Sequence, residues 1–435
     1  MLQEKLRTSV GLKLFMIGFL TLVLLIPAFI IQALIADREK RKSDVLKEIT
    51  SKWGEQQTIT GPVLTIPVVN TMKAPNGDVQ SMTRFINILP ESLNINGRVI
   101  PKERYRGIYK ILLYTCQLQL DGQFSLGRIQ DLDLKDGTIQ FNNSSLEFGL
   151  SDMKGVNEEI AVKWNSKEYQ AKSGIVQSAL PAGFHIKPSL EQKDAEYHFS
   201  INIDLDGSEE IRFVPVGQET NAYIESDWQH PSFTGDFLPT TRNVKENVFD
   251  ATWKILSYNR NFPQISYGSP IQYGDSFFGV KFIFPVDQYQ KTMRTVKYAI
   301  MFIGLTFLCC FLIEILNRAR MHPIQYLLIG SALVLFYLML LSLSEHMPFQ
   351  FAYLLSSAGM ILLIAFYTKS ILGNFKFMVI IVSVLIALYG FLYVNLQLHD
   401  YALLLGSAGL FVILALVMYL TRNVNWFTIL KSGND

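Results

Sequence analysis

Apolar residues fall into one long run near the start of the chain and five more runs in its last third. The first run extends from Leu14 to Ile35, and the later ones cover residues 298–316, 324–343, 349–367, 377–396 and 401–420. Each run has roughly 18–22 residues, enough for a helix to cross the ~30 Å hydrocarbon core of a bilayer. The pattern predicts a polytopic α-helical membrane protein with six transmembrane helices, the last five forming a bundle over residues 298–420.

Residues 36–297, between the first two runs, are polar and charged. The first part, 36–53, is predicted to be a helical extension of the first span. Its apolar residues recur at helical spacing, and oppositely charged pairs lie four residues apart on the polar side. Gly54 and then Gly61-Pro62 are expected to end this helix.

From Pro62 onward, short β-branched runs bounded by Pro and Gly replace the helical pattern. The clearest alternation, over residues 198–205, places Ser200, Asn202 and Asp204 on the face opposite the apolar residues. Asp-Gly pairs at 121–122 and 206–207 are expected to end strands. Residues 36–297 are therefore predicted to form a large, mainly β, sandwich-like domain inserted between helices 1 and 2.

Lys and Arg in the short connecting segments predict the orientation. The two short loops on one side, 344–348 and 397–400, contain neither residue. The segments on the other side carry Lys5, Arg7, Lys13, Arg318, Arg320, Lys369, Lys376, Arg422 and Lys431. Because such residues accumulate on the cytoplasmic side, residues 1–13 and the tail 421–435 are predicted to be cytoplasmic, and the β-rich domain periplasmic.

Composition excludes several classes of function. The 435 residues have a net charge of +2 and no basic stripe, which argues against a nucleic-acid partner. Of the cysteines, only Cys116 lies in the predicted periplasmic domain, so no disulfide forms within it. Cys309 and Cys310 lie in a span without the further ligands that a metal site needs. No nucleotide-binding, hydrolase or metalloprotease motif is present, so we expect a non-enzymatic protein without cofactors.

The stretch 226–242 is the densest non-repetitive segment and the first candidate site. A binding loop would use its aromatic, imidazole and carboxylate groups on a glycan or lipid headgroup, with candidates Trp228, His230, Phe233, Asp236 and Phe237. A catalytic set of Ser232, His230 and Asp236 is a weaker alternative, because residues so close in sequence seldom converge. The favoured interpretation is a rigid connector whose aromatic side chains fill the sandwich core.

A second candidate lies at the predicted outer mouth of the helical bundle. The polar residues that we expect there at similar depth are Asp287, Glu345, His346, His399 and Asp400. Such groups could bind a divalent metal or respond to pH. The favoured interpretation is that they are ordinary interfacial residues satisfied by water and headgroups, so no metal site is predicted.

Glu314 is the third candidate, because an ionisable group at membrane depth suggests function. The favoured interpretation is an interfacial pair with Arg318, four residues later. A proton or ion relay would need ionisable partners deeper in other spans, and apart from the two cysteines and several tyrosines the span interiors contain none.

Several blocks of this sequence, in order, resemble the CreD family of bacterial inner-membrane proteins. They are GPVLTIP (61–67), RGIY (106–109), WQHPSFTGDFLP (228–239), PVDQYQ (285–290), HPIQYLLIG (322–330), FYLMLLSLSEH (336–346), DYALLLGSAGLF (400–411) and TRNVNW (421–426). The resemblance implies an inner-membrane location and a link to cell-envelope integrity and envelope regulation. It assigns no catalytic or binding residue.

We therefore expect an inner-membrane protein whose periplasmic domain binds an envelope component, such as a protein, lipid or glycan, and whose spans contact the bilayer. Two rival functions share this layout. One is a permease-like component driven by a separate ATPase, against which the short loops 317–323 and 368–376 argue. The other is a membrane-embedded enzyme that modifies lipids or glycans through the outer-mouth residues.

Overall fold

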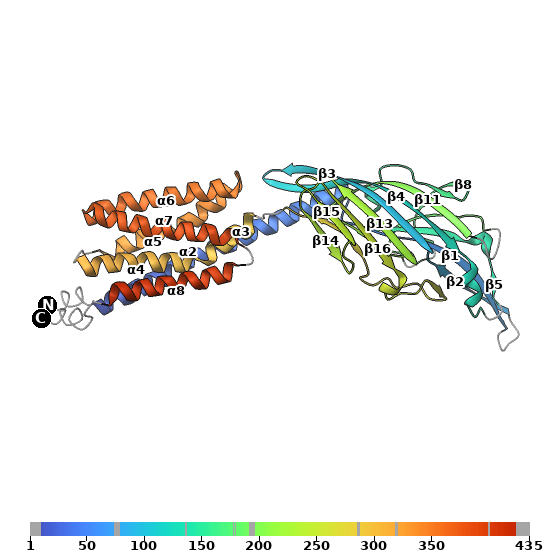
Figure 1. Ribbon diagram of the computed structural model, residues 1–435, viewed down its shortest axis with the longest axis horizontal. Helices are drawn as coiled ribbons and strands as arrows, with labels where there is room; N and C mark the ends of the chain where they lie inside the picture. The colour runs from blue at the N-terminus through green and yellow to red at the C-terminus, as the bar shows by residue number, and fades with distance from the viewer. Residues whose placement is uncertain are drawn as a thin grey trace. The chain divides into compact units, whose positions relative to one another are not determined.

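The computed structural model describes residues 10–73, 79–134, 137–176, 178, 180–190, 196–284, 288–317, 321–398 and 401–422. The chain divides into two compact units (Figure 1). We name them the helical unit, residues 1–42 with 286–435, and the β unit, residues 43–285.

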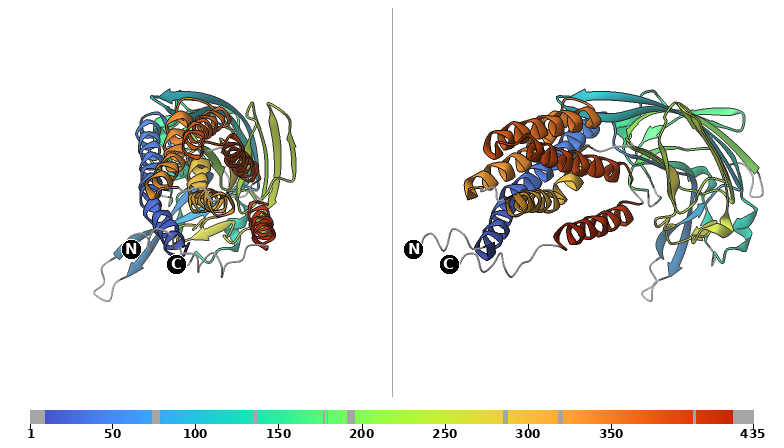
Figure 2. Two further views of the ribbon diagram at one scale, coloured as in Figure 1. Left: turned by 90° about the vertical axis from the view of Figure 1, so that its left-hand side faces the viewer. Right: turned by 60° about the vertical axis from the view of Figure 1, so that its left-hand side comes forward.

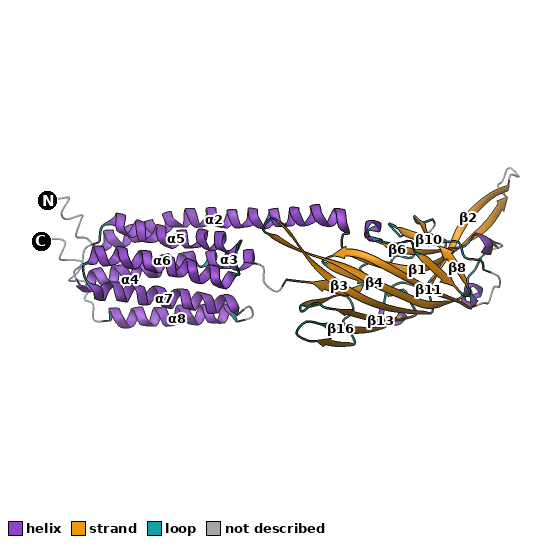
Figure 3. Cartoon of the chain, turned by 90° about the horizontal axis from the view of Figure 1, so that it is seen from above, coloured by secondary structure: helices purple, strands orange, loops and turns teal. Residues whose placement is uncertain are grey.

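Helices account for nearly all of the described part of the helical unit, and they run roughly parallel or antiparallel to one another (Figure 3). They are α2 (Val10–Trp53), α3 (Gln288–Lys297), α4 (Ala299–Asn317), α5 (Pro323–Ser344), α6 (Phe349–Leu372), α7 (Phe375–Gln397) and α8 (Ala402–Thr421). Large apolar side chains are exposed on their outer surfaces, for example Phe15, Phe366 and Phe411. An extensive apolar surface of this kind is typical of helices that contact lipid.

Among the described residues, four helices are long and apolar enough to cross a membrane: α2, α5, α6 and α7. Helices α3 and α4 meet at a bend of 43° and add a fifth candidate if they are counted as one span. The apolar part of α8, Leu404–Tyr419, is shorter. The polytopic helical architecture is confirmed, whereas the sixth span stays a prediction.

Helix α3 differs from the sequence-based expectation. We assigned residues up to 297 to the β domain, but residues 288–297 are helical and belong to the helical unit. The buried face of α3 includes Lys291, Thr292 and Thr295 beside Tyr289 and Val296. Because α3 has only ten residues, most of them polar, it lacks the long apolar run that predicts a membrane span.

The β unit contains two curved sheets, which form separate layers (Figure 2). In the described residues, sheet A has ten strands: β14 (Pro231–Gly235), β18 (Phe278–Phe282), β12 (Glu210–Phe213), β1 (Gln57–Lys73), β6 (Ser145–Leu150), β10 (Gly183–Ile186) and β9 (Lys172–Ser173) in order, with β2 (Val79–Ile88), β17 (Ile265–Tyr267) and β5 (Thr138–Ile139) beside this path. Sheet B, counted in the same way, has eight: β15 (Thr241–Val244), β16 (Phe249–Leu256), β13 (Glu219–Ser226), β3 (Ser92–Arg106), β4 (Tyr109–Ser125), β11 (Glu196–Ser208), β7 (Ala161–Trp164) and β8 (Lys167–Gln170).

One continuous hydrophobic core lies between the two sheets. Aromatic rings from opposite sheets meet in it, and the centroids of Trp253 and Phe278 are 5.3 Å apart. Phe148 and Phe199 make a similar edge contact at 6.4 Å. The β unit is therefore a sandwich, as predicted, and its one shared core shows that it is a single sandwich, which the sequence left open.

The longest strands of sheet B pair along most of their length. β3 and β4 form a hairpin around Gly107, whose φ of +59° lies in the left-handed region that glycine tolerates. β11 continues the antiparallel pairing on the other side of β4. β13 joins β3 in parallel, which brings residues 219–226 beside residues 92–99.

Candidate binding site

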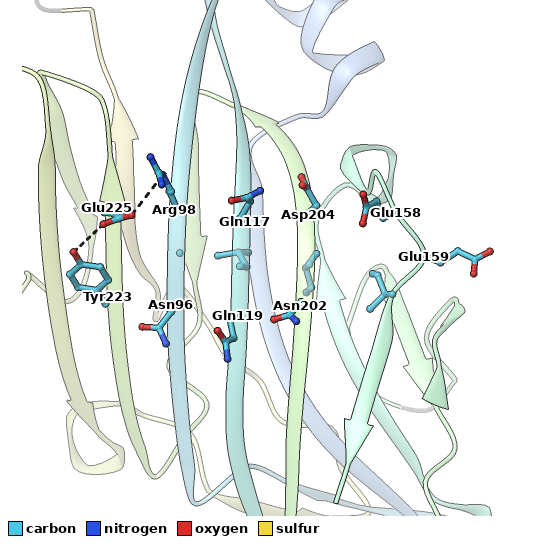
Figure 4. Close-up of a pocket in the computed structure, with 14 residues that line it drawn as sticks. Asn96, Arg98, Gln117, Gln119, Glu158, Glu159, Asn202, Asp204, Tyr223 and Glu225 are labelled. Atoms are coloured by element: carbon cyan, nitrogen blue, oxygen red, sulfur yellow. Dashed lines mark hydrogen bonds and ion pairs between the residues drawn. The ribbon is translucent and has the colours of Figure 1, made fainter. Parts of the chain in front are cut away.

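Polar side chains cover the outer face of four adjacent strands in sheet B (Figure 4). We name this surface the amide face and define it by Asn96, Arg98, Gln117, Gln119, Asn202, Asp204, Tyr223 and Glu225. Each of these residues alternates with a buried neighbour, such as Gly97, Leu118 or Ile203, because successive side chains in a strand point to opposite faces.

The strand register aligns these side chains into two rows. One row is Tyr223 of β13, Asn96 of β3, Gln119 of β4 and Asn202 of β11. The other is Glu225, Arg98, Gln117 and Asp204 from the same strands in the same order. Each row therefore crosses four strands at right angles to them, with about 4.8 Å between neighbours.

The amide face lines a groove of about 580 Å³, which Glu158 and Glu159 also line. Among the described residues that line it, four carry carboxylates, namely these two with Asp204 and Glu225, whereas one, Arg98, is a cation. The groove is therefore acidic, which disfavours anionic ligands.

Few of the polar groups that line the groove form hydrogen bonds or ion pairs within the described chain. Arg98 Nε lies 3.8 Å from Glu225 Oε1, and the Tyr223 hydroxyl donates to Glu225 Oε2 at 3.2 Å. Partial burial, followed by the hydrogen bond to Glu225, raises the pKa of Tyr223, so this phenol is a neutral donor. Within the described chain, the four amide side chains have no hydrogen-bond partner.

Asp204 presents an acceptor that the described chain leaves unused. Its Oδ1 is buried from solvent and has no hydrogen-bond partner there. Buried polar atoms are usually paired, so an unpaired one beside a groove favours a ligand or bound water at that position. By contrast, Asn221 and Asn94 on the same sheet are bonded to each other at 3.3 Å.

The stretch 226–242 does not form a loop over a site. Its central residues form β14 at the edge of sheet A, where Phe233 makes edge contacts with Phe249 and Trp253. The carbonyl of Phe237 accepts from Trp253 Nε1 at 3.1 Å. Trp228 packs on Phe284. This arrangement supports the connector interpretation, in which the aromatic side chains complete the core.

The catalytic alternative for this stretch is inconsistent with its geometry. His230 and Asp236 are exposed and flank the two ends of β14. Six residues of extended chain span about 20 Å at roughly 3.3 Å per residue. The two side chains are therefore far too distant to act together on Ser232.

The structure gives a partial view of the outer-mouth residues. Glu345 accepts a hydrogen bond from the Tyr289 hydroxyl at 3.2 Å and lies 3.8 Å from Arg38 Nη1. His346 follows it and is exposed. Asp287, His399 and Asp400 lie outside the described residues, so the convergence of this set stays a prediction.

Glu314 has three described partners that we did not expect, whereas its expected pairing with Arg318 stays a prediction. It is 5% exposed, and its carboxylate pairs with Lys13 of α2. It also accepts from the backbone N–H of Met321 at 3.1 Å and from the Tyr326 hydroxyl at 3.2 Å. We name this group the Glu314 junction; Arg318 lies outside the described residues. The junction connects α2, α4, the segment before α5 and α5 itself.

Sequence reasoning missed the amide face, although its signal is present in the chain. Amides or carboxylates occupy alternate positions in NINGR (94–98), QLQLD (117–121) and NID (202–204). Each segment alone reads as the exposed side of a strand. Their alignment depends on the order of strands in sheet B, including the parallel pairing of β13 with β3.

Comparison with known proteins gives one consistent match along the chain. The family model described as "Inner membrane protein CreD" matches residues 9–427. The protein of that description from Escherichia coli (strain K12) is 33% identical over 412 residues, covering 93% of this chain and 91% of the relative. Among solved structures, an M1 zinc metallopeptidase mutant from Deinococcus radiodurans matches with a TM-score of 0.20 and 8% identity, covering 44% of this chain and 41% of that chain. A similarity this low assigns neither a fold nor an activity.

Proposed function

Because the chain belongs to the CreD family of inner membrane proteins, we propose that it supports cell-envelope integrity without catalysing a reaction. In this proposal the β unit binds an envelope component or a partner protein through the amide face. The observation that carries the proposal is the groove whose aligned amides and buried Asp204 oxygen have no partner in the described chain. The fold does not use these exposed amides, so their donors and acceptors are available to a ligand.

The proposal also includes six spans, cytoplasmic termini and a periplasmic β unit. Two features support it. Lys and Arg are absent from the short loops 344–348 and 397–400 and present in the segments on the other side. Helix α8, Ala402–Thr421, is apolar and 20 residues long, so it has the length of a sixth span.

Cysteine labelling tests this orientation. Tyr258 in the β unit is 91% exposed, so a Tyr258→Cys variant should react with a membrane-impermeant maleimide in cells whose outer membrane is permeabilised. The matched control is Lys376→Cys in the exposed first turn of α7, which should react only after the inner membrane is opened. Native Cys116 gives little background, because burial makes it inaccessible and raises the pKa of its thiol. Labelling in the reverse order would reject the orientation.

Complementation tests the amide face. In cells that lack the protein, we expect a variant with Asn96, Gln119 and Asn202 all changed to Ala to fail to restore growth on an envelope-stressing detergent. The matched control changes three exposed amides of the β unit outside the groove, Gln170, Asn243 and Asn247, to Ala and should restore growth. Equal growth of the two variants at equal protein level would reject the proposed site.

A further inference from the structure

The chemistry of the amide face also indicates which class of ligand it binds. Resting on the function proposed above, we propose that the ligand is an uncharged polysaccharide chain that lies across β13, β3, β4 and β11. Four arguments support this class: the hydrogen-bonding groups, the charge, the spacing and the scarcity of exposed apolar side chains.

The hydrogen-bonding groups match a sugar. A side-chain amide both donates and accepts, and so do the hydroxyl and acetamido groups of a sugar. Three of the four amides lie side by side in one row, and the fourth, Gln117, lies in the next row. None of their side chains forms a hydrogen bond within the described chain. Asp204 Oδ1 is buried and has no partner in the described chain, so a rotation of this side chain towards the groove would add an acceptor for a hydroxyl hydrogen.

Charge excludes the polyanionic alternatives. Arg98 already faces Glu225, and the other charged groups of the groove are the carboxylates of Glu158, Glu159 and Asp204. A phosphorylated or carboxylated polymer would meet net repulsion there. An uncharged chain meets none, and its hydroxyl groups can donate to the carboxylates.

The spacing of the rows suits a repeating polymer. Each row offers one side chain per strand at about 4.8 Å intervals, close to the length of one ring in a β-1,4-linked polysaccharide. Tyr223 stands at one end of its row with its ring 38% exposed, so it offers an aromatic surface for a sugar ring. A chain that crosses the strands would therefore meet one polar contact per sugar.

A protein partner fits the groove less well. The centres of protein interfaces are usually apolar and aromatic and are depleted in Asp and Glu. Here the apolar lining residues Leu118, Ile160 and Ile203 are buried, and Tyr223 is the one aromatic residue among those that line the groove. The side chains left exposed to a partner are mostly polar or charged.

Titration of the full-length protein with fully N-acetylated chitohexaose, an uncharged β-1,4-linked oligosaccharide, tests this inference. The protein should be in lipid nanodiscs, because maltoside detergents would themselves compete. We expect saturable binding that the Asn96/Gln119/Asn202 alanine variant weakens by about tenfold or more, since each lost hydrogen bond costs roughly twofold to tenfold in affinity. The Gln170/Asn243/Asn247 variant should bind like the wild type, and Tyr223→Phe should retain most of the affinity that Tyr223→Ala loses.

Three results would overturn the inference. The first is that neither chitohexaose nor cellohexaose binds, while the alanine variant still fails in complementation; the site would stand and the ligand class would be wrong. The second is that heparin, a polyanion, binds as tightly as the uncharged chains. The third is that the control variant loses as much affinity as the amide-face variant. Normal complementation by the amide-face variant would instead reject the proposed function itself.

Discussion

The Glu314 junction in the helical unit and the amide face in the β unit are both polar, but they differ in how their groups are used. At the junction, one buried carboxylate accepts from Lys13, from Tyr326 and from the backbone of Met321. On the amide face, four amides and a buried Asp204 oxygen have no partner in the described chain. We infer that the junction stabilises the fold, whereas the amide face is available to a ligand.

This difference separates two kinds of polar residue that look alike in sequence. Glu314 drew attention because a carboxylate at membrane depth suggests function. The amides do not suggest function in the sequence, because polar residues on the outer face of a sheet are ordinary. In the folded chain the hydrogen bonds indicate the opposite: Glu314 is used by the fold and the amides are not. Variants at Glu314 should therefore lower stability, whereas variants of the amides should weaken ligand binding.

The largest expected effect on stability is that of Glu314→Ala. The change leaves the Lys13 ammonium, the Tyr326 hydroxyl and the Met321 N–H without their acceptor, which should cost about 3 kcal/mol. Thermal unfolding of the purified protein, monitored by size-exclusion chromatography, measures the loss. Changing both Lys13 and Glu314 to Met should recover part of it, because no charge is then left unpaired. Wild-type stability of the single variant would contradict this role.

A smaller effect is expected for Arg212→Met in the β unit. Burial alone would raise the pKa of Glu210, but hydrogen bonds from Arg212 at 2.7 Å and Thr234 at 2.7 Å outweigh it, so the pKa is lowered overall. The stability from this lowered pKa is fully present above the ordinary glutamate value of 4.5 and is lost as pH falls through the lower folded-state value. At neutral pH the variant should lose about 1–2 kcal/mol, and its stability should change less on acidification.

Tryptophan fluorescence during denaturant unfolding, repeated from neutral pH downward, measures both properties. The matched control is Arg98→Met on the amide face, where arginine and glutamate are exposed and 3.8 Å apart. Its effect should stay below about 1 kcal/mol, as for other exposed pairs. Equal losses of stability from Arg212→Met and Arg98→Met would contradict the distinction between a polar group that stabilises the fold and one on the amide face.

The smallest expected effect on stability is that of the Asn96/Gln119/Asn202 alanine variant. These side chains are exposed and make no hydrogen bonds within the described chain, so each change should alter stability by no more than about 0.5 kcal/mol. The melting temperature of the purified variant measures this directly. A substantial loss would mean that the amides stabilise the sheet, and the complementation result would then need a structural explanation.

Hydropathy was enough to predict the membrane helices and the β domain, because both depend on long or alternating apolar patterns. Local turn signals were less informative. The Asp-Gly pair at 121–122 lies inside β4, which continues to Ser125, whereas the pair at 206–207 lies one residue before the end of β11 at Ser208. A Cβ on Gly207 would come within 2.4 Å of the Tyr114 hydroxyl, and one on Gly122 within 2.1 Å of the Ser92 carbonyl. These glycines are required for close packing, which a turn motif does not distinguish.

The candidate sites depended on contacts between distant segments, which single-sequence patterns do not contain. The aromatic residues of 226–242 pack as the connector interpretation predicted, but their place on an edge strand follows from pairing with β18, about 45 residues later. Glu314 pairs with Lys13, 301 residues away, a contact that the sequence did not indicate. The amide face needs four strands from three parts of the chain to be in register.

Site-specific photocrosslinking in living cells tests the central claim most directly. Gln119, in the middle of the amide face, and Asn243, an exposed amide on β15 outside the groove, would each be replaced by photoreactive benzoylphenylalanine. We predict a light-dependent adduct with an envelope component from position 119 and none from position 243. No adduct from position 119, or equal adducts from both positions, would contradict the assignment of the amide face as the binding site.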